Sequence, residues 1–358
     1  MSTAIKRTAL TLAVLFALAA ALFAYNYFRY FIIWHPTESV SFASGDIDIA
    51  GTLILPEGRA PYPAIVILHG SGPDDVNGPG YRVSANNFVR YGFAVLLYDK
   101  RGVGASGGDF ETALYSDFID DALSAVAYLA GRDDIDRRRI GLQGNSESGW
   151  FTPEIASRSG NVAFILNEVG PPLSWVENVI WEVRNDFLAD GIAEADVDVL
   201  VDFTRRRWAY YQAAAADPSL ADGPERDALE AELQAIRESV PGAADVLPES
   251  LLAYDEKTYA DFAADTLYEP APWLERLDIP MLYVFGEHDI NVPTKKSVAF
   301  LEAFREEHDK DIEIIVLPGV GHALANWRGV FSAGYPPGYL AMTGDKAVEM
   351  ASAATRRP

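Results

Sequence analysis

The sequence predicts an α/β fold with a mostly parallel sheet, helices on both faces and a block of helices inserted before the last strands. The first observation is an alternation of apolar segments with segments of helical composition, and such alternation is typical of a parallel sheet. The second is a gap, because strand-like segments stop near residue 170 and return only near 280. The strands are expected near 63–69, 93–99, 138–143, 162–168, 280–285 and 312–317, and the helices between them near 82–91, 112–131 and 147–158.

Two short elements at 38–44 and 47–55 are expected to form a hairpin that leads into this sheet. At the other side of the first block, Gly170-Pro171-Pro172 ends the strand at 162–168, because proline cannot extend a central strand. The core is therefore expected to comprise residues 36–170 and 271–358.

Residues 171–270 are predicted to form a helical cap inserted in that core. Trp175, Val179, Val183 and Phe187 recur every four residues, as on one face of a helix, and two further helices follow near 197–208 and 229–236. The segment holds 22 Asp and Glu against 7 Lys and Arg. We interpret this excess as a solvated outer face, with attraction of cationic substrates as the alternative. Two of its tryptophans, Trp175 and Trp208, are candidates for lining a substrate pocket.

The first 35 residues are predicted to form a separate membrane segment. Lys6-Arg7 precede an uncharged, apolar run from Ala9 to Tyr25, and aromatic residues follow it at 25–30. A membrane-spanning helix needs about 17–25 residues and a signal-peptide core about 7–15. We favour an uncleaved anchor with a cytoplasmic N-terminus and an extracytoplasmic catalytic domain, and keep export after signal cleavage as the alternative.

Composition excludes several classes of function. Lys and Arg number 29 against 52 Asp and Glu, a formal net charge of −23, whereas nucleic-acid binding needs basic patches. The sequence contains no cysteine, which excludes disulfides, thiol catalysis and cysteine-based zinc sites. We expect a small-molecule substrate and no nucleic-acid partner.

The segment Gly144-Asn145-Ser146-Glu147-Ser148-Gly149 has the composition of a nucleophile elbow. It lies between the strand ending at 143 and the helix at 147–158. A sharp turn there holds a serine Oγ above the sheet and requires small neighbours. The usual pattern is G-x-S-x-G, and here Ser148 stands in the last position. Ser146 is the predicted nucleophile.

A serine nucleophile needs a histidine base that is oriented by a carboxylate. Of five histidines, His322 has the best context, since it follows the strand at 312–317 and the turn 318–321. Asp289 lies in the loop after the preceding strand, with Glu287 as the competing acid. The order Ser146, Asp289, His322 is that of hydrolases with this type of elbow.

An oxyanion formed at Ser146 would need two backbone N–H donors. The amide of Glu147 directly follows the nucleophile, and the segment His69-Gly70-Ser71-Gly72-Pro73 follows the strand at 63–69. The amide of Ser71 is the favoured second donor, with Gly72 next.

With these residues the chain resembles the α/β-hydrolases. More narrowly, it is similar to the bacterial serine-aminopeptidase-like branch, whose members read HGSGP, D-x-RGxGxS and GHSEGG. Those motifs correspond here to residues 69–73, 99–106 and 144–149, and the segment 334–339 also matches. The similarity extends over roughly residues 36–345. It implies a serine hydrolase, and no metal or cofactor is implied.

The main hypothesis is cleavage of carboxylic esters through an acyl-enzyme on Ser146. An aminopeptidase or amidase that uses the same residues is the alternative, since the name of the branch suggests such activity. A member of the fold that binds a ligand without catalysis is the third possibility, and the complete set of Ser, His and Asp argues against it.

Overall fold

The computed structural model describes residues 3–326, 328–329 and 332–354, so the ends of the predicted segments 1–35 and 271–358 lie partly outside the described residues. At its centre is an eight-stranded sheet in the order β1-β2-β4-β3-β5-β6-β7-β8. β1 and β2 pair antiparallel, as do β2 and β4, and all other neighbours are parallel. The strands are β1 Thr37–Ser44, β2 Ile47–Ile54, β3 Tyr62–Leu68, β4 Ala94–Tyr98, β5 Ile135–Asn145, β6 Val162–Glu168, β7 Met281–Gly286 and β8 Ile312–Leu317.

Alternate side chains of the strands enter two separate apolar cores. On β3, Ala64, Val66 and Leu68 pack on one face, and Ile65 and Ile67 on the other. Both faces are buried by helices, which explains why the central strands read as continuous apolar runs. The first face is covered by α3 Tyr115–Ala130, α4 Ser148–Ser159, α10 Ala271–Leu274 and α11 Thr294–His308, and the second by α2 Pro79–Arg90 and α12 Tyr339–Ala354.

This architecture confirms the predicted fold class. β5 begins three residues earlier than expected, at Ile135, because the polar segment 136–139 is extended although its side chains lie largely outside the core. A register shift separates the pair Tyr62 and Ile135 from the regular pairing of β3 with β5 that starts at Ala64.

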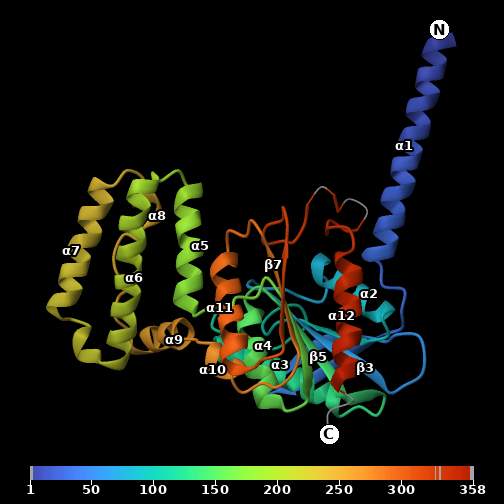
Figure 1. Ribbon diagram of the computed structural model, residues 1–358. Helices are drawn as coiled ribbons and strands as arrows, with labels where there is room; N and C mark the ends of the chain where they lie inside the picture. Colours follow the sequence, from blue (N-terminus) through green and yellow to red (C-terminus); the bar gives the residue numbers. More distant parts are fainter. Residues whose placement is uncertain (1–2, 327, 330–331, 355–358) are drawn as a thin grey trace.

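Residues 171–270 contain no strand and build a third apolar core of their own. Figure 1 shows these helices standing beside the sheet as a separate block. Trp175 and Val179 contact both this core and the core beneath α3 and α4, so they join the two bodies. The elements are α5 Trp175–Ala189, α6 Glu194–Ala216, the 3-10 helix Pro218–Leu220, α7 Pro224–Ser239, α8 Ala243–Val246 and α9 Glu256–Thr266.

The N-terminal helix α1, Thr3–Tyr30, projects away from the rest of the molecule (Figure 1). Within it, Leu10–Tyr30 is long and apolar enough to cross a membrane, with a mean hydropathy of 1.8. A signal sequence has the same properties. The C-terminal end of α1 is docked on α2, where the Asn86 amide donates hydrogen bonds to the carbonyls of Tyr30 (2.8 Å) and Ile32 (3.1 Å).

Candidate functional site

Ser146 occupies the turn between β5 and α4. Its φ of +51° lies in the left-handed region, where a residue with a side chain is strained. The turn is tight because Gly149 lies against Gly170, and a Cβ at Gly149 would come within 2.3 Å of the Gly170 Cα. The first turn of α4 therefore packs closely on the segment that follows β6, and the chain reverses at Ser146.

Ser148, which replaces the usual glycine of the motif, braces this turn. Its buried hydroxyl accepts a hydrogen bond from the Asn145 N–H (2.8 Å) and lies 3.0 Å from the Leu68 carbonyl, to which it can donate. The side chain thus ties the elbow to the end of β3.

The structure brings His322 and Asp289 to Ser146 from two other loops. With its proton on Nδ1, His322 donates to Asp289 Oδ2 over 2.9 Å, and its Nε2 lies 2.9 Å from Ser146 Oγ, from which it accepts. Asp289 is buried, and its Oδ1 also accepts hydrogen bonds from the N–H groups of Asn291 and Val292, both at 2.9 Å. The imidazole therefore lies between the hydroxyl and a carboxylate with fixed orientation.

Glu287, the competing acid, lies elsewhere. Its side chain is half-exposed and its Oε2 accepts a hydrogen bond from the Gly319 N–H at 2.9 Å, so it braces the turn that precedes His322. His288 is exposed beside Glu287, and His308 lies at the C-terminal end of α11 near Glu275. The buried His69 lies in the loop after β3, and burial, then the nearby Lys100 charge, lowers its pKa to about 3.

The predicted oxyanion donors lie at the same cavity as Ser146. Ser71 and Glu147 both line it, and among the described residues neither backbone N–H is engaged in a hydrogen bond. Gly70 packs directly against Ser146, since a Cβ there would lie 3.3 Å from the Ser146 Cβ. The absence of a side chain at Gly70 lets the loop approach Ser146.

This cavity has a volume of about 290 Å³ and lies between the end of the sheet and α5. Trp175 forms part of its wall, and its indole N–H donates to the Tyr115 hydroxyl at 3.0 Å. Trp208 packs against Trp175, with the ring centroids 4.9 Å apart, and is not among the residues that line the cavity.

Three polar side chains in this cavity were missed by sequence reasoning. Asn178 and Glu182 belong to α5, and Asn291 follows Asp289. The Asn178 amide donates to the Asn291 carbonyl (3.2 Å), and the Asn291 amide donates to Glu182 Oε1 (2.7 Å). These contacts link the inserted helices to the loop of Asp289. Spacing along the chain carries no sign of them, since more than 100 residues separate the partners.

A second cavity of about 340 Å³ opens on the other side of Ser146 and His322. Tyr81, Leu324 and Tyr335 line it, together with Glu168 at the end of β6. Burial raises the pKa of the Glu168 carboxyl to about 7. The Glu168 carbonyl accepts the Ser146 N–H at 3.0 Å, so the same residue holds the elbow through its backbone.

The described part of the chain contains no cluster of three or more His, Asp or Glu side chains that could hold a metal ion. The cluster of Ser146, His322 and Asp289 can transfer a proton from the hydroxyl to the imidazole beside an open cavity.

Comparison with known proteins agrees with the fold. The profile of the X-Pro dipeptidyl-peptidase (S15) family matches residues 45–323. Esterase EstD of Thermotoga maritima is 28% identical over 297 residues, which are 81% of this chain and 62% of EstD. This chain therefore spans less than two thirds of that relative.

Among solved structures, an esterase of Pyrococcus furiosus superposes with a TM-score of 0.55 at 14% identity, covering 89% of this chain and 92% of that one. Est1E of Butyrivibrio proteoclasticus, solved with ferulic acid, superposes with a TM-score of 0.53 at 16% identity over 89% of this chain and all of its own. At such identities these likenesses concern the fold alone. The family match and the fold together confirm the resemblance to α/β-hydrolases: this chain belongs to the X-Pro dipeptidyl-peptidase (S15) family within the α/β-hydrolase superfamily.

Proposed function

We propose that the protein is a serine hydrolase that cleaves carboxylic esters through an acyl-enzyme. The observation that carries this proposal is the hydrogen-bonded chain from Ser146 Oγ through His322 to buried Asp289, at a cavity with two free backbone N–H groups. Ser146 Oγ attacks the acyl carbon while His322 Nε2 takes its proton. Asp289 keeps the imidazole in the tautomer that can accept this proton and stabilises the imidazolium that forms.

The negative charge that develops on the acyl oxygen is bound by the N–H groups of Ser71 and Glu147. One such donor is worth about 3–4 kcal/mol of transition-state stabilisation. The C–O bond to the alcohol then breaks as the imidazolium returns the proton to the leaving oxygen. A water deprotonated by His322 hydrolyses the acyl-enzyme and restores Ser146. Ser146 lies between cavities of about 290 and 340 Å³, which would accept the two arms of an ester.

A second candidate is an aminopeptidase or dipeptidyl-peptidase on the same residues. The S15 family match favours it, and so does Glu182, whose carboxylate lines the cavity beside Ser146 and could bind a substrate ammonium group. The relative EstD favours the ester. In both cases residues 171–270 act as a cap that selects the substrate, with Trp175 in the pocket wall and Trp208 supporting it.

We also propose that α1 tethers the catalytic domain to the outside of a membrane. Its apolar stretch supports a span, Lys6 and Arg7 supply the cytoplasmic positive flank, and the aromatic residues at 25–30 suit the opposite interface. Export after signal cleavage is the alternative.

Ser146→Ala tests the nucleophile. We expect it to abolish ester turnover and covalent labelling by a fluorophosphonate, with unchanged circular dichroism. Peptide mapping of the labelled wild type should identify Ser146, and a label on Ser148 or Ser71 would contradict the assignment. A panel of p-nitrophenyl esters and aminoacyl and X-Pro anilides, with Glu182→Gln as a second variant, separates the two activities. A peptidase should prefer the anilides and lose affinity for them in Glu182→Gln, whereas an esterase should do neither.

A further inference from the structure

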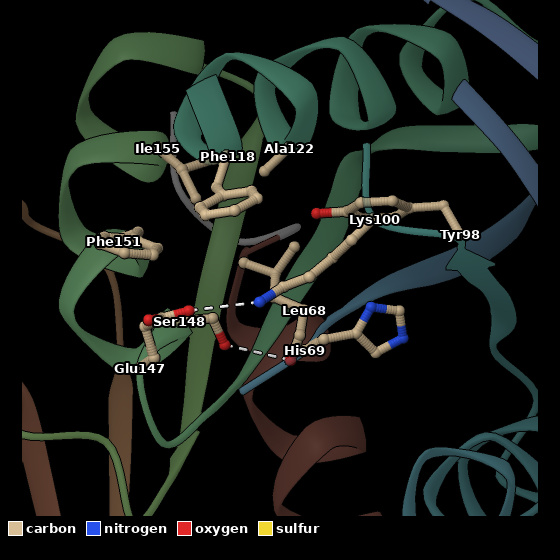
Figure 2. Close-up of a pocket in the computed structure, with 10 residues that line it drawn as sticks. All are labelled: Leu68, His69, Tyr98, Lys100, Phe118, Ala122, Glu147, Ser148, Phe151 and Ile155. Atoms are coloured by element: carbon tan, nitrogen blue, oxygen red, sulfur yellow. Dashed lines mark hydrogen bonds and ion pairs between the residues drawn. The ribbon is translucent and has the colours of Figure 1, made fainter. Parts of the chain in front are cut away.

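Lys100 is a buried cation that the proposed reaction does not yet use. It follows β4, and only about 5% of it is exposed. Its ammonium Nζ lies 4.7 Å from the ring centroid of Phe118, and it donates to the Gly70 carbonyl at 2.6 Å and to Glu147 Oε2 at 3.2 Å. Figure 2 shows the side chain crossing from the end of β4 to the Glu147 carboxylate. One ammonium group thus joins the loop after β3 to the nucleophile elbow.

The contact with Gly70 controls the direction of a proposed oxyanion donor. The Gly70 carbonyl and the Ser71 N–H belong to one planar peptide group, and in a trans peptide they point in opposite directions. Binding of the Gly70 carbonyl by Lys100 therefore directs the N–H of Ser71, a residue that lines the cavity, away from Lys100. Gly70 has no side chain to resist rotation of this peptide, so an external contact is required to hold it.

Gly70 is held from its other side as well. Its N–H donates to the Tyr81 hydroxyl at 2.9 Å, and that hydroxyl donates to Asp74 Oδ2, also at 2.9 Å. The residue before Ser71 thus has both backbone polar groups engaged by side chains from other elements. Such contacts are typical of a loop whose orientation must be kept.

The contact with Glu147 involves the residue that carries the second proposed donor. The backbone N–H of Glu147 is the other proposed oxyanion donor, and its carboxylate is mostly buried beside Lys100, which is its ion-pair partner. Burying two opposite charges is costly and adds little stability compared with apolar side chains of the same size. The ion pair is therefore better explained by its effect on geometry, because it sets the distance between the N–H groups of Ser71 and Glu147.

We propose that Lys100 is a positioning residue that assembles the oxyanion hole by binding the Gly70 carbonyl and the Glu147 carboxylate at once. This inference rests on the proposed function, because it concerns how the reaction's developing charge is bound. It predicts a loss of transition-state binding without a loss of substrate binding.

The test compares Lys100→Met with Arg101→Met in the full-length protein. Methionine retains an unbranched apolar stem and removes the charge. Because Glu147 would then be buried without a partner, the double variant Lys100→Met/Glu147→Gln, which leaves no unpaired charge, is measured beside it. Arg101 is the matched control, since it pairs with Asp121 at 2.8 Å and touches neither Gly70 nor Glu147.

The readouts are kcat and KM for a p-nitrophenyl ester, and Ki for a trifluoromethyl ketone and for the secondary alcohol of the same chain. The ketone forms a tetrahedral oxyanion on Ser146, and the alcohol does not. We expect kcat to fall about 10- to 100-fold in both Lys100 variants, below the full loss of one donor. KM and the Ki of the alcohol should stay within about twofold, and the Ki of the ketone should rise by the factor lost in kcat/KM. Arg101→Met should leave all four values within about twofold.

The inference is overturned if a folded Lys100 variant keeps kcat within about twofold of wild type, or if KM and the Ki of the alcohol rise as much as the Ki of the ketone. Failure of the proposed function looks different. In that case the wild type would not hydrolyse esters or anilides, or Ser146→Ala would retain the turnover. The proposed role of Lys100 would then be refuted together with the proposed function.

Discussion

Replacing Asp289 by asparagine reverses the direction of the hydrogen bond between His322 Nδ1 and residue 289, and keeps the shape of the side chain. Oδ1 of Asp289 accepts two backbone N–H groups, from Asn291 and Val292, and Oδ2 faces His322 Nδ1 at 2.9 Å. An asparagine must therefore place its carbonyl oxygen at the first position and its NH₂ group at the second. His322 Nδ1 lies 2.9 Å from the position of this NH₂ group and 3.1 Å from the carbonyl oxygen, which already accepts two backbone N–H groups. We therefore expect Nδ1 to accept from the NH₂ group, which leaves the proton on Nε2, and an Nε2–H cannot take the proton of Ser146.

The magnitude follows from this change of tautomer. Enzymes with the same arrangement lose about 10⁴-fold in kcat when the aspartate becomes asparagine. We expect about 10³- to 10⁴-fold here, which corresponds to roughly 4–5 kcal/mol of activation free energy at 1.36 kcal/mol per tenfold. KM should change little, since Asp289 is buried behind His322 and does not line the 290 Å³ cavity.

Glu287→Gln is the matched control, two residues away. Its amide oxygen can still accept the Gly319 N–H, and its side chain is half-exposed, so kcat should remain within about twofold. Both variants are assayed on a p-nitrophenyl ester after their circular dichroism has been compared with wild type. A mild effect of Asp289→Asn together with a severe effect of Glu287→Gln would refute the assignment of the acid.

Three further predictions concern the pocket, the buried carboxyl and the N-terminal helix. Trp175→Ala should shift the preferred acyl-chain length in p-nitrophenyl esters more than it lowers acetyl-ester turnover, because Trp175 forms the cavity wall; equal losses on all chain lengths would mean that it only supports the fold. For Glu168, the pKa is raised from 4.5 to about 7 by burial, so its contribution to stability is present below about pH 4.5 and is lost as pH rises through 7. Glu168→Gln should therefore gain on the order of 3 kcal/mol over wild type at pH 8 and little at pH 4 in urea unfolding, whereas parallel pH curves would contradict this. An export-dependent reporter fused to the C-terminus should be active, and the mature protein should keep Met1. A new N-terminus would indicate signal cleavage. A silent reporter with soluble cytoplasmic enzyme would contradict both the membrane anchor and the cleaved signal peptide.

Much of the fold was predictable because its signals are local. Parallel strands buried on both faces read as apolar runs, and the elbow reads as small residues around Ser146 between a strand and a helix. The helical block was visible as a change from short apolar runs to four-residue periodicity between residues 171 and 270. The order of the strands along the chain also placed Asp289 and His322 in loops after successive strands.

Other features depend on which loops become neighbours in space. The sheet order β4-β3-β5 puts the loop of Lys100 beside that of Gly70 and the elbow, although up to 47 residues separate the contacting side chains. The sequence shows Ser148 in place of the usual glycine of the motif, and only the structure shows that its hydroxyl contacts the end of β3.

The pocket likewise has one feature that the sequence predicts and one that only the fold decides. Helical periodicity put Trp175 on an apolar helix face, and only packing of α5 against the sheet made Trp175 a wall with Trp208 packed against it. Local propensity and burial pattern depend on residues that are neighbours in the sequence, so they can be predicted from it. The partners of a buried charge or an indole ring come from distant segments, and only the folded chain brings them within contact distance.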